Sequence, residues 1–194
     1  MNDIVNDPLN NTAEPRYAIG IDLGTTHSAL SYVDLQASDG EQAVDAVLPI
    51  PQLTAPGTIE ALPLLPSFLY LPHPDELPAG ERALPWSDTE ETAIAGEMAR
   101  NRGATTPIRL VSSAKSWLCH PGVDRRAAIL PTDAPDEVTR VSPLDASTHY
   151  LRHLRQAPGE SRALAMFCGC TVVAGVAALA GTALGAIDSP MRAS

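Results

Sequence analysis

One stretch near the N-terminus, YAIGIDLGTTHSAL at residues 17–30, constrains the fold more than any other part of the sequence. An apolar run ends at Asp22, Gly24 and two threonines follow, and a second alternation of apolar and polar residues then begins. This pattern predicts a β-hairpin with strands at 17–22 and 28–33, because Gly24 permits a tight reversal of the chain between them.

Proline limits the strands that follow the hairpin. Nine of the 18 prolines fall between residues 49 and 85, and proline has no N–H group to give to a β-ladder. The strands expected at 43–50 and 67–71 must therefore be short, lie at a sheet edge, or be separated by long loops.

Helical signals dominate the second half of the chain. A short helix is predicted at 94–102, closed by Gly103, and a helical turn is predicted at 113–118. A longer helix is predicted from Ser142 to about residue 156, since serine is a capping residue, proline stands at the first helical position and an acidic residue lies in the first turn. Together with the strands, these helices indicate an α/β fold.

The composition narrows the classes of function. The chain of 194 residues carries a formal net charge of -10 and no basic run, which argues against a nucleic-acid partner because neutralising phosphates needs clustered Lys and Arg. Residues 1–15 have neither a basic region nor an apolar run, so they are expected to be a disordered lead rather than a secretory signal. The three cysteines lack framework spacing, which favours a reducing compartment, and we expect a cytoplasmic protein.

The tip of the expected hairpin has groups suited to a nucleotide. An aspartate at the end of a buried strand is costly unless something pairs with it, and a hydrated Mg²⁺ ion would be a suitable partner for Asp22. Gly24 would let the backbone approach an anion closely, while the N–H groups and hydroxyls of Thr25 and Thr26 would donate to phosphate oxygens. The alternative from the pattern alone is an ordinary β-hairpin turn.

The sequence IGIDLGTTHSAL resembles the first phosphate loop of the actin, sugar-kinase and heat-shock ATPase superfamily, and most closely that of the heat-shock protein 70 (DnaK-like) chaperone family. Three later segments also resemble that family. Leu65–Phe68 is similar to its Thr-Pro-Ser strand, Ile94–Arg100 to a helix start, and Ser113–Leu118 to the segment that holds its catalytic lysine. The resemblance covers Arg16 to Gln156, and we take residues 16–157 as the corresponding domain.

The resemblance implies a partial actin-like ATPase lobe of the ribonuclease H-like type, with a mixed sheet and flanking helices, that binds ATP and Mg²⁺. It implies catalytic roles for Asp22, which would position the magnesium through water, and for Lys115, which would contact the terminal phosphate and orient the attacking water. The helix at 142–156 would be the one that leads into the family's next strand. The implied nucleotide-binding residues are Gly24, Thr25, Thr26 and His27.

The implied function is ATP-driven binding and folding of unfolded client proteins, with co-chaperones as further partners of the intact relative. Two departures from the family pattern affect the expected activity. Ser116 stands where an arginine usually follows the lysine, and no second D-x-G-x-x motif occurs in residues 157–194. We therefore expect a truncated domain that lacks the second phosphate loop and the adenosine site and is inactive as an ATPase alone. The alternatives are a carbohydrate kinase fragment of the same superfamily and a membrane-anchored binding module without turnover.

The tail at residues 158–194 differs in composition from the rest of the chain. Residues 163–187 are 25 residues rich in Ala and Gly without a charge, which exceeds the roughly 20 residues needed to span a bilayer. Three interpretations stand open for the tail: a truncated or frame-shifted end without structure, a transmembrane helix that keeps the N-terminal part in the cytoplasm, or a buried helix.

Two other groups of residues are weak candidates for metal binding. His149 and His153 have the i, i+4 spacing of a helical metal site, but no third ligand stands nearby, so an exposed helix face is expected. Cys168 and Cys170 form a single C-x-C pair, which is too little for a soft-metal site.

Overall fold

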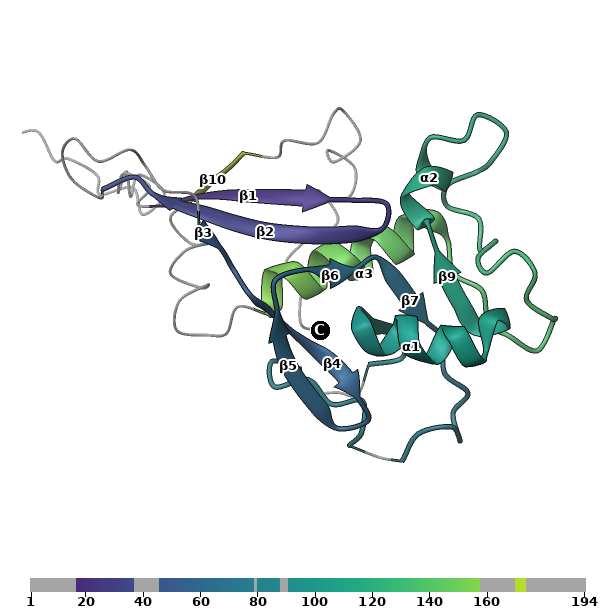
Figure 1. Cartoon of the computed structure of the whole chain (residues 1–194). Coiled ribbons are helices and arrows are strands. Elements are labelled where there is room, and N and C mark those ends of the chain that lie inside the picture. Colours follow the sequence, from purple (N-terminus) through teal and green to yellow (C-terminus); the bar gives the residue numbers. More distant parts are fainter. Residues whose placement is uncertain (1–16, 37–45, 79, 88–90, 158–169, 174–194) are drawn as a thin grey trace, which may run out of the picture.

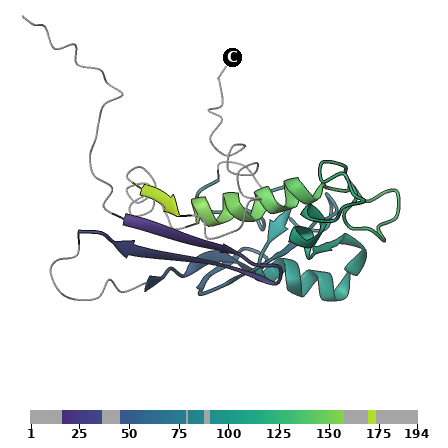
Figure 2. The same ribbon diagram turned by 90° about the horizontal axis from the view of Figure 1, so that it is seen from above.

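The structure is a computed structural model that describes residues 17–36, 46–78, 80–87, 91–157 and 170–173. It has a mixed α/β fold, as predicted, in which small sheets pack against helices (Figures 1 and 2). The expected disordered lead at residues 1–15 lies outside the described residues. So does the tail, apart from its residues 170–173.

The largest sheet is built around the predicted hairpin and has the order β10-β1-β2-β3, with β6 also paired to β2. β1 and β2 are antiparallel, and β3 and β6 pair antiparallel with β2. β10 pairs parallel with β1. The strands are β1 (Tyr17–Leu23), β2 (His27–Asp34), β3 (Ala46–Val47), β6 (Leu65–Pro66) and β10 (Cys170–Val173).

Two smaller antiparallel sheets complete the strands of the described part. One pairs β4 (Ile50–Ala55) with β5 (Thr58–Leu62). The other has the order β8-β7-β9 and consists of β7 (Phe68–Tyr70), β8 (Ile94–Ala95) and β9 (Leu110–Ser112).

The proline-rich region contains strands, as predicted, but their bounds differ from the predicted ones. The strand expected at 43–50 is wrong, because β3 and β4 belong to different sheets on either side of Pro49, while residues 43–45 lie outside the described residues. The strand expected at 67–71 is shortened to β7. The β4–β5 hairpin was not predicted, although Pro56-Gly57 is a common turn signal and Gly57 has a φ of 66° that favours glycine.

The described helices are α1 (Glu97–Thr105), α2 (Ala114–Leu118) and α3 (Pro143–Gln156), with a short 3-10 helix, η1, at Pro107–Arg109. The predictions for α2 and α3 are confirmed. Ser142 caps α3, since its side-chain oxygen accepts a hydrogen bond from the backbone N–H of Asp145 at 3.0 Å.

The helix expected at 94–102 has different bounds because two glycines were misread. Ile94 belongs to β8, and the helix begins only after Gly96, whose φ of 90° breaks the extended strand. Gly103 lies inside α1 rather than after it. A Cβ atom there would stand 2.3 Å from a methyl carbon of Leu110, so glycine lets the helix pack closely on β9.

Helix α3 joins two hydrophobic clusters and lies alongside the main sheet (Figure 2). Toward its C-terminal end, Leu154 packs with Ile19 and Leu30 of the β1–β2 hairpin. Nearer its N-terminal end, Tyr150 packs with the cluster that contains Val111 of β9. The helix therefore fixes the hairpin relative to the β8-β7-β9 sheet.

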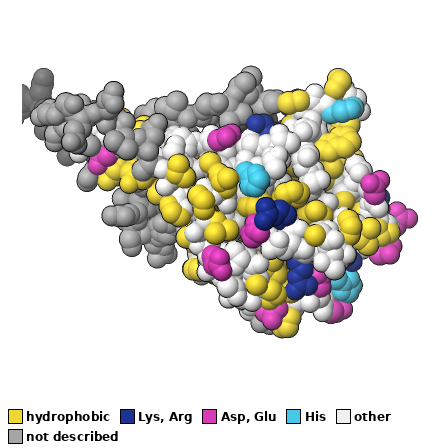
Figure 3. All heavy atoms as spheres, in the orientation of Figure 1, with side chains coloured by type: hydrophobic (Ala, Val, Ile, Leu, Met, Phe, Trp, Pro, Cys, Tyr) yellow, Lys and Arg dark blue, Asp and Glu magenta, His cyan; other side chains and the backbone are white. Residues whose placement is uncertain are grey.

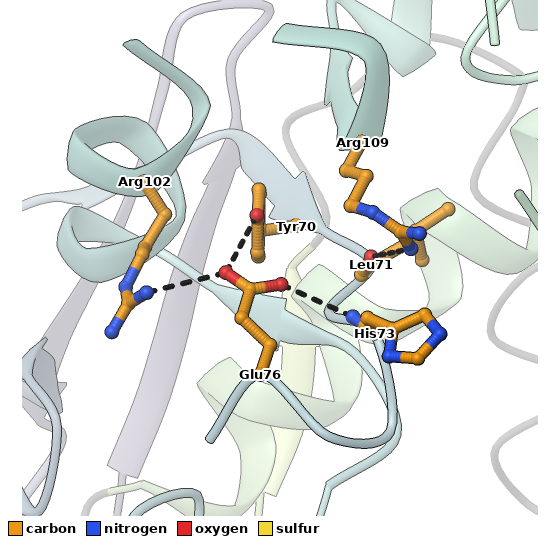
Figure 4. Close-up of polar contacts among 6 residues, drawn as sticks. All are labelled: Tyr70, Leu71, His73, Glu76, Arg102 and Arg109. Carbon is orange, nitrogen blue, oxygen red and sulfur yellow. Dashed lines mark hydrogen bonds and ion pairs between the residues drawn. The ribbon is translucent and has the colours of Figure 1, made fainter. Parts of the chain in front are cut away.

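A polar cluster holds the connection that follows β7 (Figure 4). The carboxylate of Glu76 accepts hydrogen bonds from the Tyr70 hydroxyl at 2.8 Å, from Arg102 at 3.2 Å and from the backbone N–H of His73 at 3.1 Å. Burial raises the pKa of Tyr70, and the nearby Glu76 carboxylate adds to that effect. These bonds attach the connection to α1 and β7, so we assign the cluster a structural role.

Charged side chains of both signs are scattered over the face shown in Figure 3, and Lys and Arg do not gather there into one patch. No helix among the described residues is long and apolar enough to cross a membrane. The uncharged run at 163–187 lies outside the described residues except for β10, which is a strand.

Candidate functional site

The loop between β1 and β2 makes the predicted tight reversal at Gly24. A Cβ atom on Gly24 would stand 2.0 Å from the backbone oxygen of His27, so no larger residue fits without moving the loop. Thr25 and Thr26 are exposed at the tip. Their N–H groups and hydroxyls make no hydrogen bond within the described part of the chain. The loop thus presents unused donors to solvent.

Two carbonyl groups of the same loop accept hydrogen bonds from Ser67. The hydroxyl of Ser67, just after β6, donates to the carbonyl oxygen of Gly24 at 2.8 Å. The backbone N–H of Ser67 donates to the carbonyl oxygen of Thr26 at 2.9 Å. Ser28 of β2 lies behind them, with its hydroxyl oxygen 3.0 Å from that of Ser67, and both serines are buried.

Lys115 lies beside the loop. Its amine, on α2, donates to the carbonyl oxygen of Leu23 at 2.5 Å, across 92 residues of sequence. Leu23 separates Asp22 from Gly24, so the positive charge stands at the root of the loop. This residue is also the sole lysine of the chain. A cation next to exposed N–H groups is an arrangement that attracts anions.

Asp22 lies where the sequence predicted, at the end of β1 and opposite Ala29 of β2, but its surroundings differ from the expectation. In β1 only Ile19 is fully buried, and the side chain of Asp22 is exposed. The argument that this aspartate needs a partner to offset burial is therefore wrong. An exposed single carboxylate still fits a magnesium ion that keeps most of its waters, since Mg²⁺ commonly binds through one or two carboxylates.

His27 is half-buried at the start of β2, where its backbone pairs with Pro66 of β6. The residue contributes to the loop through its main chain, because its backbone oxygen stands against Gly24. The predicted nucleotide-binding residues thus fall in one place, together with Lys115.

The two histidines of α3 do not form an exposed face, and that expectation is wrong. His153 is 7% exposed, its Nε2–H donates to the carbonyl oxygen of Pro51 at 2.9 Å, and the ring of Trp86 meets it edge-on at 5.4 Å. Burial lowers the pKa of His153 to about 4 and also lowers the pKa of half-buried His149. No group of three or more residues in the described ranges could hold a metal ion.

Sequence reasoning missed the contact of Ser67 with the loop and the buried position of Ser28 next to it. The signal for Ser67 was present, since Leu65–Phe68 was singled out as a family-like segment, but its contact with the loop depends on the pairing of β6 with β2. Ser28 gave no signal, because a serine near the start of a strand is common.

The comparisons with known proteins add no identification. No protein-family model matches this chain, and no curated protein matches it either. The loop, Ser67 and Lys115 are thus the features from which a function can be inferred.

Proposed function

We propose that this chain is the N-terminal portion of an actin-like ATPase lobe of the heat-shock protein 70 type, which binds ATP with Mg²⁺ at the β1–β2 loop. The observation that carries the proposal is the long-range placement of Lys115 at the root of a loop whose threonine donors are unused. A conventional hairpin turn needs no such cation.

The sheet order supports the fold part of the proposal. A hairpin continued by β3, followed after α3 by a strand parallel to β1, gives the order β10-β1-β2-β3. This order supports the proposal that the helix from Pro143 leads into the next strand of a ribonuclease H-like sheet.

Each residue of the site has a physical role in the proposal. Gly24 permits close approach of the phosphates, and the N–H groups and hydroxyls of Thr25 and Thr26 donate to phosphate oxygens. The Lys115 amine exchanges the Leu23 carbonyl for an oxygen of the terminal phosphate and stabilises its negative charge. Asp22 accepts hydrogen bonds from the waters of Mg²⁺, an ion that neutralises phosphate charge when bound.

In the described residues, these groups approach a triphosphate from one side. We therefore propose that the chain binds MgATP weakly and hydrolyses it no faster than background, because phosphoryl transfer needs groups positioned around the whole phosphate. Client binding driven by ATP, with co-chaperones as partners, is proposed for the intact protein in the cytoplasm.

The test is calorimetric titration of the purified chain with MgATP, beside variants Asp22→Asn and Lys115→Ala. Glu60→Gln and Arg152→Ala are matched controls, because both side chains are exposed away from the loop. We expect Lys115→Ala to weaken binding about tenfold or more, as for loss of a charge-assisted contact. Equal binding by the wild type and all four variants would contradict the proposal.

Lys115 offers a second measurement, since no other lysine competes for an amine-reactive reagent. MgATP should slow acylation of Lys115, located by peptide mapping, while the N-terminal amine reacts at an unchanged rate. Single-turnover hydrolysis at the rate of intact family members, lost in Asp22→Asn and Lys115→Ala, would show that the chain is a complete catalyst instead.

A further inference from the structure

Three carbonyl groups of the β1–β2 loop are held by groups outside the loop, and two of the three are held by Ser67. Its hydroxyl bonds the Gly24 carbonyl at 2.8 Å and its backbone N–H bonds the Thr26 carbonyl at 2.9 Å. The third, the Leu23 carbonyl, is bonded by Lys115. Ser67 is 3% exposed, so water cannot readily replace its hydroxyl.

A peptide group is planar and trans, so its C=O and N–H point in opposite directions. The carbonyl of Gly24 and the N–H of Thr25 belong to one peptide group. Because Ser67 holds this carbonyl toward β6, the N–H of Thr25 must point away from β6, toward solvent. The bond to the Thr26 carbonyl fixes the other end of the loop in the same manner.

We propose that Ser67 is a positioning residue that presents the Thr25 N–H to the phosphates, an inference that rests on the proposed nucleotide binding for its functional part. Ser67 does not touch the nucleotide. Its hydroxyl sets the orientation of the Gly24–Thr25 peptide, and without it that peptide can rotate and the donor is no longer preorganised.

Ser28 provides the matched control. Its hydroxyl, also buried, contacts that of Ser67 but no carbonyl of the loop. Ser28→Ala therefore disturbs the same buried region and leaves the bond from Ser67 to Gly24 in place. Ser112→Ala is the exposed control on β9. Ser67→Thr keeps the hydroxyl, and Ser67→Cys keeps the volume with a weaker donor.

The first measurement is ¹⁵N relaxation of the nucleotide-free chain. We expect Ser67→Ala to lower the order parameters of Thr25 and Thr26 and to shift the Thr25 amide resonance. Ser28→Ala, Ser112→Ala and Ser67→Thr should keep wild-type values. Should Ser67→Ala not fold, Ser67→Cys is expected to show the same loss of order. Loop order equal to wild type in a folded Ser67→Ala or Ser67→Cys variant would overturn the proposal.

The second measurement is affinity for MgATP, with the urea midpoint recorded beside it. Ser67→Ala should weaken binding about tenfold, while Ser28→Ala changes it by less than about threefold even if both lower stability equally. Equal weakening by both variants would show that Ser67 acts only through the fold and would overturn its positioning role. A wild type that binds no MgATP would contradict the proposed function, while the relaxation data would still decide whether Ser67 orders the loop.

Discussion

The carbonyls that are held at the β1–β2 loop have their partners, Ser67 and Lys115, in distant parts of the sequence. Ser67 directly follows β6, the strand that pairs with β2, and Lys115 comes from a helix 92 residues further along than Leu23. Sequence alone indicated the glycine and the threonines, because turns and anion loops favour these residue types. It did not indicate that Asp22 would be exposed, since burial depends on which face of β1 is covered by α3.

At this scale the clearest test of the loop is Gly24→Ala. The added Cβ would stand 2.0 Å from the backbone oxygen of His27, and a backbone atom cannot move aside as a flexible side chain can. We expect the free energy of unfolding to fall by about 1–3 kcal/mol, as for other overpacked positions. Urea denaturation measures it. Gly122→Ala is the control, expected to change stability by less than about 0.5 kcal/mol, because only the His120 ring lies nearby, at 3.6 Å. Similar effects of both changes would contradict the close approach.

His153 makes stability depend on pH. Its folded-state pKa of about 4 lies below the ordinary value of 6.5, so the unfolded chain binds more protons between these values. Its contribution is therefore present above pH 6.5 and is lost as the pH falls toward 4. Between pH 7.5 and 5.5 the loss is about 1.4 kcal/mol. Half-buried His149 acts in the same direction.

The measurement is urea unfolding at pH 7.5 and pH 5.5. His153→Gln keeps an N–H donor for Pro51 and cannot be protonated, so it should lose most of this dependence. The exposed His120, changed to Gln, should leave the dependence as in the wild type. A wild-type profile that is flat over this range would show that His153 is not held neutral by burial.

At the scale of elements, the helix with local signals at both ends was predictable, while the two-residue strands and the bounds of α1 were not. Helix α3 has its cap residue, its first-turn acid and its stop within its own sequence. Helix α1 lacks such local signals. Glycine is required at Gly96 and Gly103 because other elements pack closely against these positions. A Cβ atom on Gly96 would stand 2.4 Å from the side-chain oxygen of Gln52, a contact that no local pattern announces. The two-residue strands β3, β6 and β8 exist only through their partners.

The cap of α3 gives the test at this scale. Ser142 accepts from the Asp145 N–H at 3.0 Å and is 2% exposed. Ser142→Ala should lower stability by about 1 kcal/mol, since it removes the oxygen that caps the Asp145 N–H at the helix end. Ser142→Gly should cost only a few tenths of a kcal/mol from loss of capping, because glycine suits this position. Thermal unfolding of the wild type and both variants measures these losses of stability. A Ser142→Ala variant as stable as the wild type would show that the hydroxyl does not act as the cap.

At the scale of the whole molecule, the sequence predicted the α/β class and the hairpin with its loop, while the assembly of the sheet could not be predicted. The pairing of β10 with β1 joins residues more than 150 positions apart, beginning with Tyr17 opposite Cys170. Nothing in an Ala/Gly-rich tail indicates such a pairing, because register is set by contacts that form only in the folded chain. The position of Lys115 at the loop has the same origin.

The tail therefore gives the sharpest test at this scale. Its composition alone predicts that deletion of residues 158–194 leaves the urea midpoint nearly unchanged. The structure predicts the opposite, because the deletion removes β10 and turns β1 from an inner strand into an edge. Four residue pairs, from Tyr17–Cys170 to Gly20–Val173, would be lost. We expect stability to fall by at least about 2 kcal/mol, at roughly 1 kcal/mol for each ladder hydrogen bond.

Val173→Pro tests the ladder by itself, because the register of β10 on β1 directs the Val173 N–H at the carbonyl of Ile19. Proline has no N–H for the ladder, so this change should reproduce a large part of the loss with the chain at full length. Hydrogen exchange of the Ile19 and Ile21 amides, which face β10, should become faster in both variants, while amides of α1, which packs mainly on β7 and β4, keep their protection. Unchanged midpoints and unchanged exchange in β1 would mean that β10 does not hold the hairpin, and the proposal of a ribonuclease H-like lobe would lose its support.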